Sequence, residues 1–308
     1  MTDSIHTTKP ANRLTVSTLG APGESLDTVL SLLAAHGITG IELRLSLGEI
    51  ASPAMGRRER TAHRSRITDA GVYITGLASY IRIADPGVPD DVVVGALASA
   101  LEFAADLEAP TVRVFPGAPT IGASYRRVPA TTFPREECDA TAVRRLNAVA
   151  RLSRELGVHP VLETHDSHPR GEDIAAILEQ VDGPVGAVWD LMHPWRVGEP
   201  LETTWHFLHQ WLDHGAGSIQ VKDANVPESR TPVPLGQGSL PVHDLATLLH
   251  RNDYDGILCL EWEKAWHPTA PPLQVAVASL LTWHGAHWDT ETLPAAGQQD
   301  HLSTAKTS

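Results

Sequence analysis

Carboxylate and amide side chains close four apolar segments in the second half of the chain. They are Glu163, Asp190, Gln220 and Glu261. Taken singly, each is more often a helix cap or a solvated rim residue. Three carboxylates buried together would repel one another at a cost of several kcal/mol, and a divalent cation is the simplest compensation. The intervals of 27, 30 and 41 residues suit one strand and one helix each, so the pattern predicts a metal site where four strands end.

Short segments rich in Val, Ile and Leu alternate with longer amphipathic segments along the chain. The strand-like segments are 14–19, 39–45, 72–78, 111–115, 158–163, 185–190, 218–222 and 256–261. The first helical pattern runs from Ser25 to a stop at Gly37, and later ones include 57–70, 91–107, 136–156, 201–214 and 271–287. The order predicts eight strands, each followed by a helix.

Eight such units in roughly 280 residues are typical of a (β/α)8 TIM barrel, whose usual size is about 250 residues. A doubly wound open sheet is the alternative, but its first turn carries a glycine-rich phosphate-binding motif. The first turn here, 20–23, reads Gly-Ala-Pro-Gly. We therefore predict an α/β fold with one barrel domain over 13–289, a flexible segment 1–12 and a disordered tail 290–308. The active site of such a barrel lies at the carboxyl ends of its strands.

The composition excludes several classes of protein. The 308 residues include 24 Lys and Arg against 37 Asp and Glu, a net charge of −13, which argues against nucleic-acid binding. Two cysteines, Cys138 and Cys259, are too few for a disulfide framework or a cysteine zinc site. The N-terminus lacks a signal-peptide core, and no apolar stretch approaches the roughly 18 residues that span a bilayer. We expect a cytoplasmic protein without membrane partners.

Several short motifs, in this order and at these strand ends, resemble those of the xylose isomerase-like barrels. This superfamily includes sugar isomerases, ketose 3-epimerases, inosose dehydratases and dehydroshikimate dehydratases. The resemblance extends from Leu14 to about His287, and each motif is weak alone. The matching motifs are GIELR at 40–44, VLETH at 161–165, DLMH at 190–193, VKD at 221–223 with GQG at 236–238, LEWE at 260–263 and WHP at 266–268.

The resemblance implies one divalent cation held by Glu163, Asp190, Gln220 and Glu261. The family often has His where Gln220 stands, and the dehydratase branch has Gln there. An all-oxygen ligand set favours Mn²⁺ or Mg²⁺, with Co²⁺ as a substitute, over Zn²⁺. Glu163 and Glu261 are placed to remove and return a substrate proton. His193 lies where the family has a substrate-contacting or proton-relaying histidine.

Seven further residues are candidates for substrate binding. His165 and Lys222 share a strand face with the predicted ligands. The arginines would bind polar substrate groups or neutralise the carboxylates. Trp262, Trp266 and His267, which follow the last strand, would line the pocket or pack the final loop against the barrel. The full set is Arg44, Arg113, His165, Lys222, Trp262, Trp266 and His267. The loops 80–90, 116–135 and 224–240 are rich in Pro and Gly and are expected to carry specificity.

The sequence therefore predicts a metal-dependent isomerase or epimerase that acts on a small polyhydroxylated substrate through a metal-stabilised enediolate. Gln220 in place of His favours the alternative, a metal-dependent lyase: a dehydratase on a keto-polyol or dehydroshikimate-like acid, or β-elimination from a keto-glycoside. A non-catalytic binding barrel is a further alternative. The charge and the few strand-end histidines argue against an apurinic-site endonuclease. Trp205, Trp211 and Trp283 would serve a homo-oligomer interface or the packing of helices on the barrel.

Overall fold

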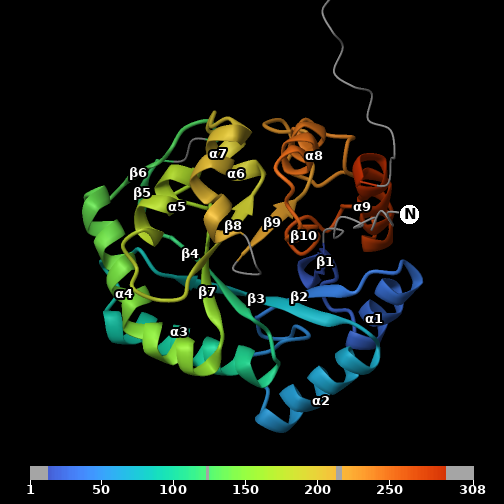
Figure 1. The fold of residues 1–308 in the computed structure, drawn as a ribbon, viewed down its shortest axis with the longest axis horizontal. Coiled ribbons are helices and arrows are strands. Elements are labelled where there is room, and N and C mark those ends of the chain that lie inside the picture. Colours follow the sequence, from blue (N-terminus) through green and yellow to red (C-terminus); the bar gives the residue numbers. More distant parts are fainter. Residues whose placement is uncertain (1–12, 123–124, 213–216, 289–308) are drawn as a thin grey trace, which may run out of the picture.

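A closed barrel of eight parallel strands forms the centre of the molecule, and the helices surround it (Figure 1). The structure is a computed structural model that describes residues 13–122, 125–212 and 217–288. Around the barrel the strand order is β1-β10-β9-β8-β7-β4-β3-β2. The strands are β1 (Arg13–Ser17), β2 (Gly40–Arg44), β3 (Tyr73–Arg82), β4 (Thr111–Phe115), β7 (His159–Glu163), β8 (Gly186–Asp190), β9 (Ser218–Val221) and β10 (Ile257–Leu260). The predicted TIM-barrel class is confirmed.

The outer ring of helices covers the barrel in chain order (Figure 1). The first helix turns an apolar stripe of Leu26, Val29, Leu30 and Leu33 towards the barrel, whereas α2 buries only Ile67. The helices are α1 (Leu26–Ala35), α2 (Arg57–Asp69), α3 (Asp90–Asp106), α4 (Arg135–Leu156), α5 (Gly171–Leu178), α6 (Met192–Arg196), α7 (Leu201–Leu208), α8 (Val242–Arg251) and α9 (Leu273–Trp288). None of these described helices combines the length and apolarity needed to cross a membrane.

The register of the strands aligns the predicted ligands. Asp190 of β8 pairs with Gln220 of β9, and Gln220 pairs with Cys259 of β10. Parallel strands in a barrel end at one face, so side chains from β7, β8, β9 and β10 meet there.

The structure departs from the sequence prediction in its details. The helix predicted over 201–214 ends at Leu208 and continues as a 3-10 turn, His209–Trp211. A small antiparallel hairpin, β5 (Thr120–Ile121) with β6 (Ala130–Thr131), lies inside the loop 116–135. Strands of two residues are too short for a periodic signal, so the sequence does not reveal them. The predicted flexible start 1–12 and tail 290–308 lie outside the described residues.

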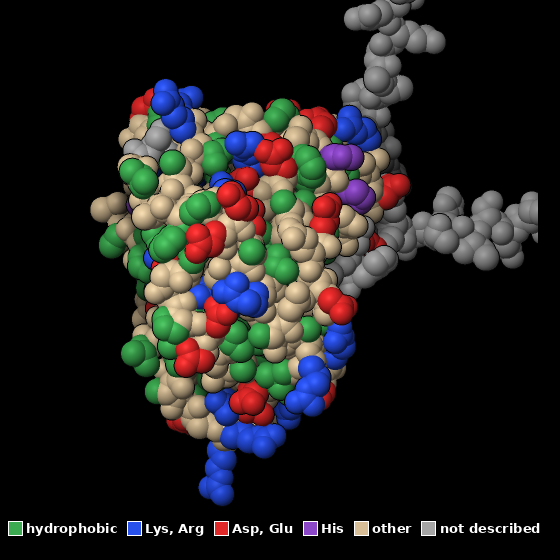
Figure 2. Space-filling view, turned by 90° about the vertical axis from the view of Figure 1, so that its left-hand side faces the viewer, with side chains coloured by type: hydrophobic (Ala, Val, Ile, Leu, Met, Phe, Trp, Pro, Cys, Tyr) green, Lys and Arg blue, Asp and Glu red, His purple; other side chains and the backbone are tan. Residues whose placement is uncertain are grey.

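The surface carries both signs of charge. On the face shown in Figure 2, Lys and Arg side chains are interspersed with Asp and Glu, and hydrophobic side chains are scattered between them. Mixed charge of this kind is typical of an ordinary solvated surface.

Arg145 of α4 anchors the loop after β3, although its side chain is only 1% exposed. Its guanidinium donates to Ile83 O (2.9 Å), to Val88 O and to Asp90 Oδ1 (2.9 Å). The neighbouring Arg144 also binds Asp90 but is 56% exposed. The loop therefore depends on one buried cation whose donors satisfy two backbone carbonyls.

We predict that Arg145→Ala lowers the free energy of unfolding by about 3 kcal/mol, because it leaves buried carbonyls without donors. Arg144→Ala, the matched control at the same carboxylate, should cost at most about 1 kcal/mol because its ion pair is exposed to solvent. Urea denaturation of both variants provides the comparison. Equal losses would show that the ion pair with Asp90, and not the hydrogen bonds to the two carbonyl groups, accounts for the stability that Arg145 contributes.

Candidate active site

The four predicted ligands lie at the carboxyl end of the barrel, all buried. Glu163 and Asp190 are the last residues of β7 and β8, and Gln220 lies within β9. Glu261 follows β10 directly. Their exposures range from 0% to 4%. The barrel therefore brings these residues to one face, in the layer below its mouth.

Two cations lie between the carboxylates. Arg113 Nη1 is 2.8 Å from Glu163 Oε2 and 3.7 Å from Glu261 Oε1. Lys222 Nζ donates to Glu261 Oε2 and lies 2.7 Å from Asp190 Oδ2. The result is an alternating row of charges, Glu163–Arg113–Glu261–Lys222–Asp190, which we call the charge row. Because Arg113 and Lys222 face carboxylates, they supply part of the charge compensation, a role that the sequence left open for Arg113 but not for Lys222.

The charge row sets unusual proton affinities. Burial raises the pKa of Glu163 to about 7, although Arg113 opposes this shift. For Lys222, burial disfavours the cation, but Asp190, Glu261 and Glu263 outweigh it and hold the pKa well above its usual range. Glu163 is therefore poised to exchange a proton near neutral pH, whereas Lys222 stays charged.

Gln220 is a buried polar side chain without partners. Within the part of the chain that the structure describes, neither its Oε1 nor its Nε2 has a hydrogen-bond partner, and the residue is 0% exposed. Each buried, unpaired polar atom costs about 1–3 kcal/mol. The amide is therefore free to contact a bound group.

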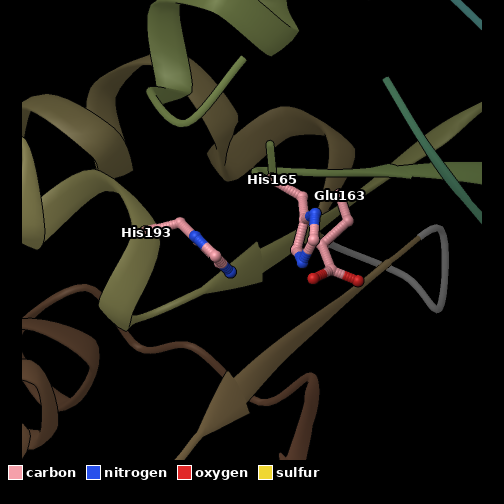
Figure 3. A group of neighbouring side chains, drawn as sticks. All are labelled: Glu163, His165 and His193. Carbon is pink, nitrogen blue, oxygen red and sulfur yellow. The ribbon is translucent and has the colours of Figure 1, made fainter. Parts of the chain in front are cut away.

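Two histidines approach Glu163 from the side of the barrel mouth (Figure 3). His165 follows β7, and His193 of α6 reaches towards it from the opposite side. One donor atom from each of Glu163, His165 and His193 lies within 4.8 Å of the others. These three residues form a second potential ligand set that shares Glu163 with the predicted one.

The two imidazoles differ in charge preference. Burial opposes protonation of His165, but Asp166, 2.9 Å away, and Glu163 outweigh it and raise its pKa. Burial and the neighbouring cations hold the pKa of His193 well below its usual range. His193 Nδ1 accepts from Arg196 Nε (3.2 Å), so the proton of the neutral ring lies on Nε2, 3.7 Å from Asp190 Oδ2. In this tautomer Nε2 is a proton donor and is not a free metal ligand.

A pocket of about 870 Å³ opens above this layer. His165, His193, Trp266 and His267, which the sequence named as candidate catalytic or substrate-binding residues, line it. The predicted metal ligands lie beneath this lining. Trp262 is 1% exposed and donates to Pro271 O (3.0 Å), so it packs the final loop, which is the other role that the sequence left open.

Arg44 contacts Trp266, which lines the pocket and is 54% exposed. The Arg44 guanidinium lies 4.7 Å from the Trp266 ring centre, and its Nε donates to Tyr80 Oη (2.7 Å). Glu49 pairs with the same guanidinium at 2.7 Å. Arg44 therefore supports the pocket from behind Trp266.

Asp223 explains the Gly-Gln-Gly motif. Its carboxylate accepts from the backbone N–H groups of Gly236, Gly238 and Leu240 at 2.9–3.1 Å. A Cβ at Gly238 would lie only 2.0 Å from Asp223 Oδ1, so glycine is required there. The loop between β9 and α8 is therefore fixed to the end of β9.

The sequence did not single out several residues of the site. Glu263 Oε1 lies 2.5 Å from Lys222 Nζ and lines the pocket. Glu263 stands within the quoted LEWE motif, so its spacing of two from Glu261 was a usable signal. Tyr125, Arg196 and Arg230 also line the pocket. Tyr125 and Arg230 come from the irregular loops, where no periodicity indicates which residues point inward.

Comparisons with known proteins agree with this architecture. A family model described as the xylose isomerase-like TIM barrel matches residues 30–283. A Streptomyces coelicolor protein provisionally named hydroxypyruvate isomerase is 28% identical over 259 residues, which is 77% of this chain and 85% of that protein.

Solved structures share the fold at low sequence identity. The Bacillus anthracis protein AsbF, assigned as a 3-DHS dehydratase, has a TM-score of 0.69 and 18% identity, over 87% of this chain and 98% of that one. The IOLI protein with a bound zinc atom has a TM-score of 0.70 and 14% identity, over 89% and 99%. A D-psicose 3-epimerase has a TM-score of 0.67 and 15% identity, over 90% and 100%.

We predict that Gln220→Ala weakens Mn²⁺ binding at least about tenfold, because it removes a ligand oxygen. His193→Ala should leave the affinity within about threefold, because the ring nitrogen facing the site carries a proton. Isothermal titration calorimetry with Mn²⁺ measures both. The reverse order of effects would assign the ion to Glu163, His165 and His193 instead.

Proposed function

The chain belongs to the xylose isomerase-like TIM barrel family, and from this premise we propose that it is a divalent-metal-dependent isomerase or epimerase of a small polyhydroxylated carbonyl compound. The observation that carries the proposal is the pair of buried carboxylates, Glu163 and Glu261, on either side of one guanidinium nitrogen of Arg113 at 2.8 and 3.7 Å. Two carboxylates so placed suit the removal and return of one proton.

The residues of the site fit a divalent cation. The unpartnered amide of Gln220 supports this proposal, because the amide oxygen is a ligand for hard cations. Glu163, Asp190, Gln220 and Glu261 would hold the ion, and Mn²⁺ or Mg²⁺ suits their oxygen atoms. When bound, the ion supplies Lewis acidity that makes the carbon beside a carbonyl group more acidic.

Glu163 is the proposed general base. In the metal-free site burial raises its pKa to about 7, and a bound divalent cation would favour the charged form that accepts a proton. Arg113 fixes the orientation of its carboxylate through a 2.8 Å charge-assisted hydrogen bond. Glu261 is the proposed second base, and Lys222 holds it in place from the other side.

The fate of the proton selects the product. Return to the opposite face of the same carbon gives an epimer, and return to the neighbouring carbon gives an isomer. The hydroxypyruvate isomerase name of the Streptomyces coelicolor relative supports the second outcome, and the psicose epimerase neighbour supports the first.

A lyase is the second candidate, and His193 favours it. Burial and nearby cations keep this imidazole neutral, with its proton on Nε2 in the site. Its Nε2–H can donate a hydrogen bond to a β-hydroxyl group and orient that group for departure. The proton that Glu163 removes from the substrate carbon would then leave with the hydroxyl group as water, which completes a dehydration.

We expect Glu163→Gln to lower turnover by about 10²–10⁴-fold, because the amide cannot accept the proton. The Mn²⁺-loaded protein is incubated in D₂O with ketoses, inososes, hydroxypyruvate and dehydroshikimate. NMR then reports deuterium at the carbon beside the carbonyl, whereas an unsaturated product indicates the lyase.

The exposed Glu137→Gln on α4 is the matched control and should leave the exchange rate unchanged. Full activity of the wild-type protein in excess chelator would contradict the metal dependence. Unchanged exchange in Glu163→Gln would contradict the role of the carboxylate.

A further inference from the structure

Two arginines flank Tyr125 at the outer part of the pocket. Arg196 ends α6, and Arg230 lies in the loop between β9 and α8. Their guanidinium carbons are 5.6 and 5.2 Å from the centre of the Tyr125 ring. All three residues line the 870 Å³ pocket. The pocket therefore carries two neighbouring positive charges on one side.

These two charges have no carboxylate partner within the protein. Among the described residues, no Asp or Glu oxygen lies within the 4.0 Å ion-pair distance of Arg196 or Arg230. Arg196 is half-buried and Arg230 is exposed. Buried or half-buried arginines such as Arg44, Arg60, Arg113 and Arg145 do have such a partner, so Arg196 departs from them. Burial is the main cause that lowers the pKa of Arg196; Tyr125, Asp190 and Asp166 raise it, and repulsion by Arg230 lowers it. A bound anion would relieve this repulsion.

Hydrogen-bond donors at this place are also unused. Arg196 uses Nε on His193 (3.2 Å) and Nη1 on Tyr125 O (2.8 Å), and among the described residues its Nη2 has no acceptor. The Tyr125 hydroxyl is buried and has no hydrogen-bond partner among the residues that the structure describes. A group with several acceptor oxygens would satisfy these donors at once.

Each carboxylate that lines the pocket already has a hydrogen-bond or ion-pair partner within the protein. Glu263 lies 2.5 Å from Lys222, Asp166 lies 2.9 Å from His165, and Asp85 accepts from Gly87 N at 2.9 Å. Asp166 still attracts Arg196 electrostatically, but among the described residues no carboxylate oxygen lies within ion-pair distance of either arginine. A direct anionic partner for the two guanidinium groups would therefore come from a bound molecule.

We propose that Arg196, Arg230 and the Tyr125 hydroxyl form a subsite for a terminal oxyanion, a carboxylate or a phosphate, on the polyhydroxylated substrate. The proposal rests on the proposed function for the rest of that substrate. A guanidinium fork matches either anion in geometry. Since Arg196 donates directly to His193, the anionic end is held next to the catalytic layer, and the carbonyl end points towards Glu163.

Three open-chain ligands of equal length test the subsite by binding alone. D-glucitol ends in an alcohol, D-gluconate in a carboxylate and D-glucitol 6-phosphate in a phosphate. Calorimetry with the full chain, metal-free and Mn²⁺-loaded, should show at least one anion binding about tenfold or more tighter than glucitol in both states. A preference for gluconate identifies a carboxylate substrate, and a preference for the phosphate identifies a phosphorylated one.

Arg196→Gln and Arg230→Gln should each reduce this preference to about threefold or less, with unchanged melting temperatures. Arg82→Gln is the matched control, because Arg82 lines the same pocket and its removal changes the pocket charge equally. It should retain the preference. Equal binding of glucitol and both anions, or equal loss in Arg82→Gln, would overturn the proposal. Because no turnover is measured, failure here is distinct from failure of the proton-transfer reaction.

Discussion

The burial of carboxylates at the end of the barrel is the constraint on which the site depends. Glu163, Asp190 and Glu261 are at most 4% exposed, and an isolated carboxylate in such a place would take up a proton instead of staying charged. The alternating arrangement with Arg113 and Lys222 keeps each negative charge next to a positive one. These five side chains, each from a different strand, therefore depend on one another. Removal of any one of them would leave another as a buried charge without a partner.

Polar contacts to the strands and helices hold the loops above the barrel in place. These contacts fix the pocket walls, although the loops have no large apolar core of their own. Asp223 fixes the loop that carries Arg230 through its backbone amides. After β7, buried His168 bridges Asp139 of α4 and Ser167, both at 2.8 Å, and Ser167 accepts from Ala118 N at 3.1 Å. The resemblance of these three side chains to a hydrolytic triad is misleading, because Ser167 is 0% exposed and its hydroxyl serves the neighbouring loop.

Periodicity and strand-end chemistry were sufficient to predict the barrel and the layer of Glu163, Asp190, Gln220 and Glu261. Both signals are local: a short run rich in Val, Ile and Leu marks a buried parallel strand, and a polar residue at its end marks the mouth. Pairing was harder to predict. Lys222 shares a face with Gln220 in the sequence, but its contacts to Asp190 and Glu263 depend on two other segments. Tyr125 and Arg230 come from irregular loops separated by more than a hundred residues, and no local pattern brings them together.

The formal charges around Lys222 bear on the kind of ion that the site would accept. With all four carboxylates charged, Glu163, Asp190, Glu261 and Glu263 carry four negative charges against two positive ones on Arg113 and Lys222, so the layer sums to −2. Burial raises the pKa of Glu163 to about 7, so a bound cation would also shift this carboxyl towards its charged form. Glu42 is not counted because, among the described residues, it makes no ion pair with Arg113 or Lys222. On the proposal made above, a divalent ion brings the sum to zero, whereas a monovalent ion leaves a buried negative charge. The same count explains how Lys222 and a metal are compatible: the ammonium group removes part of the excess charge, and the remaining two units match one Mn²⁺ or Mg²⁺.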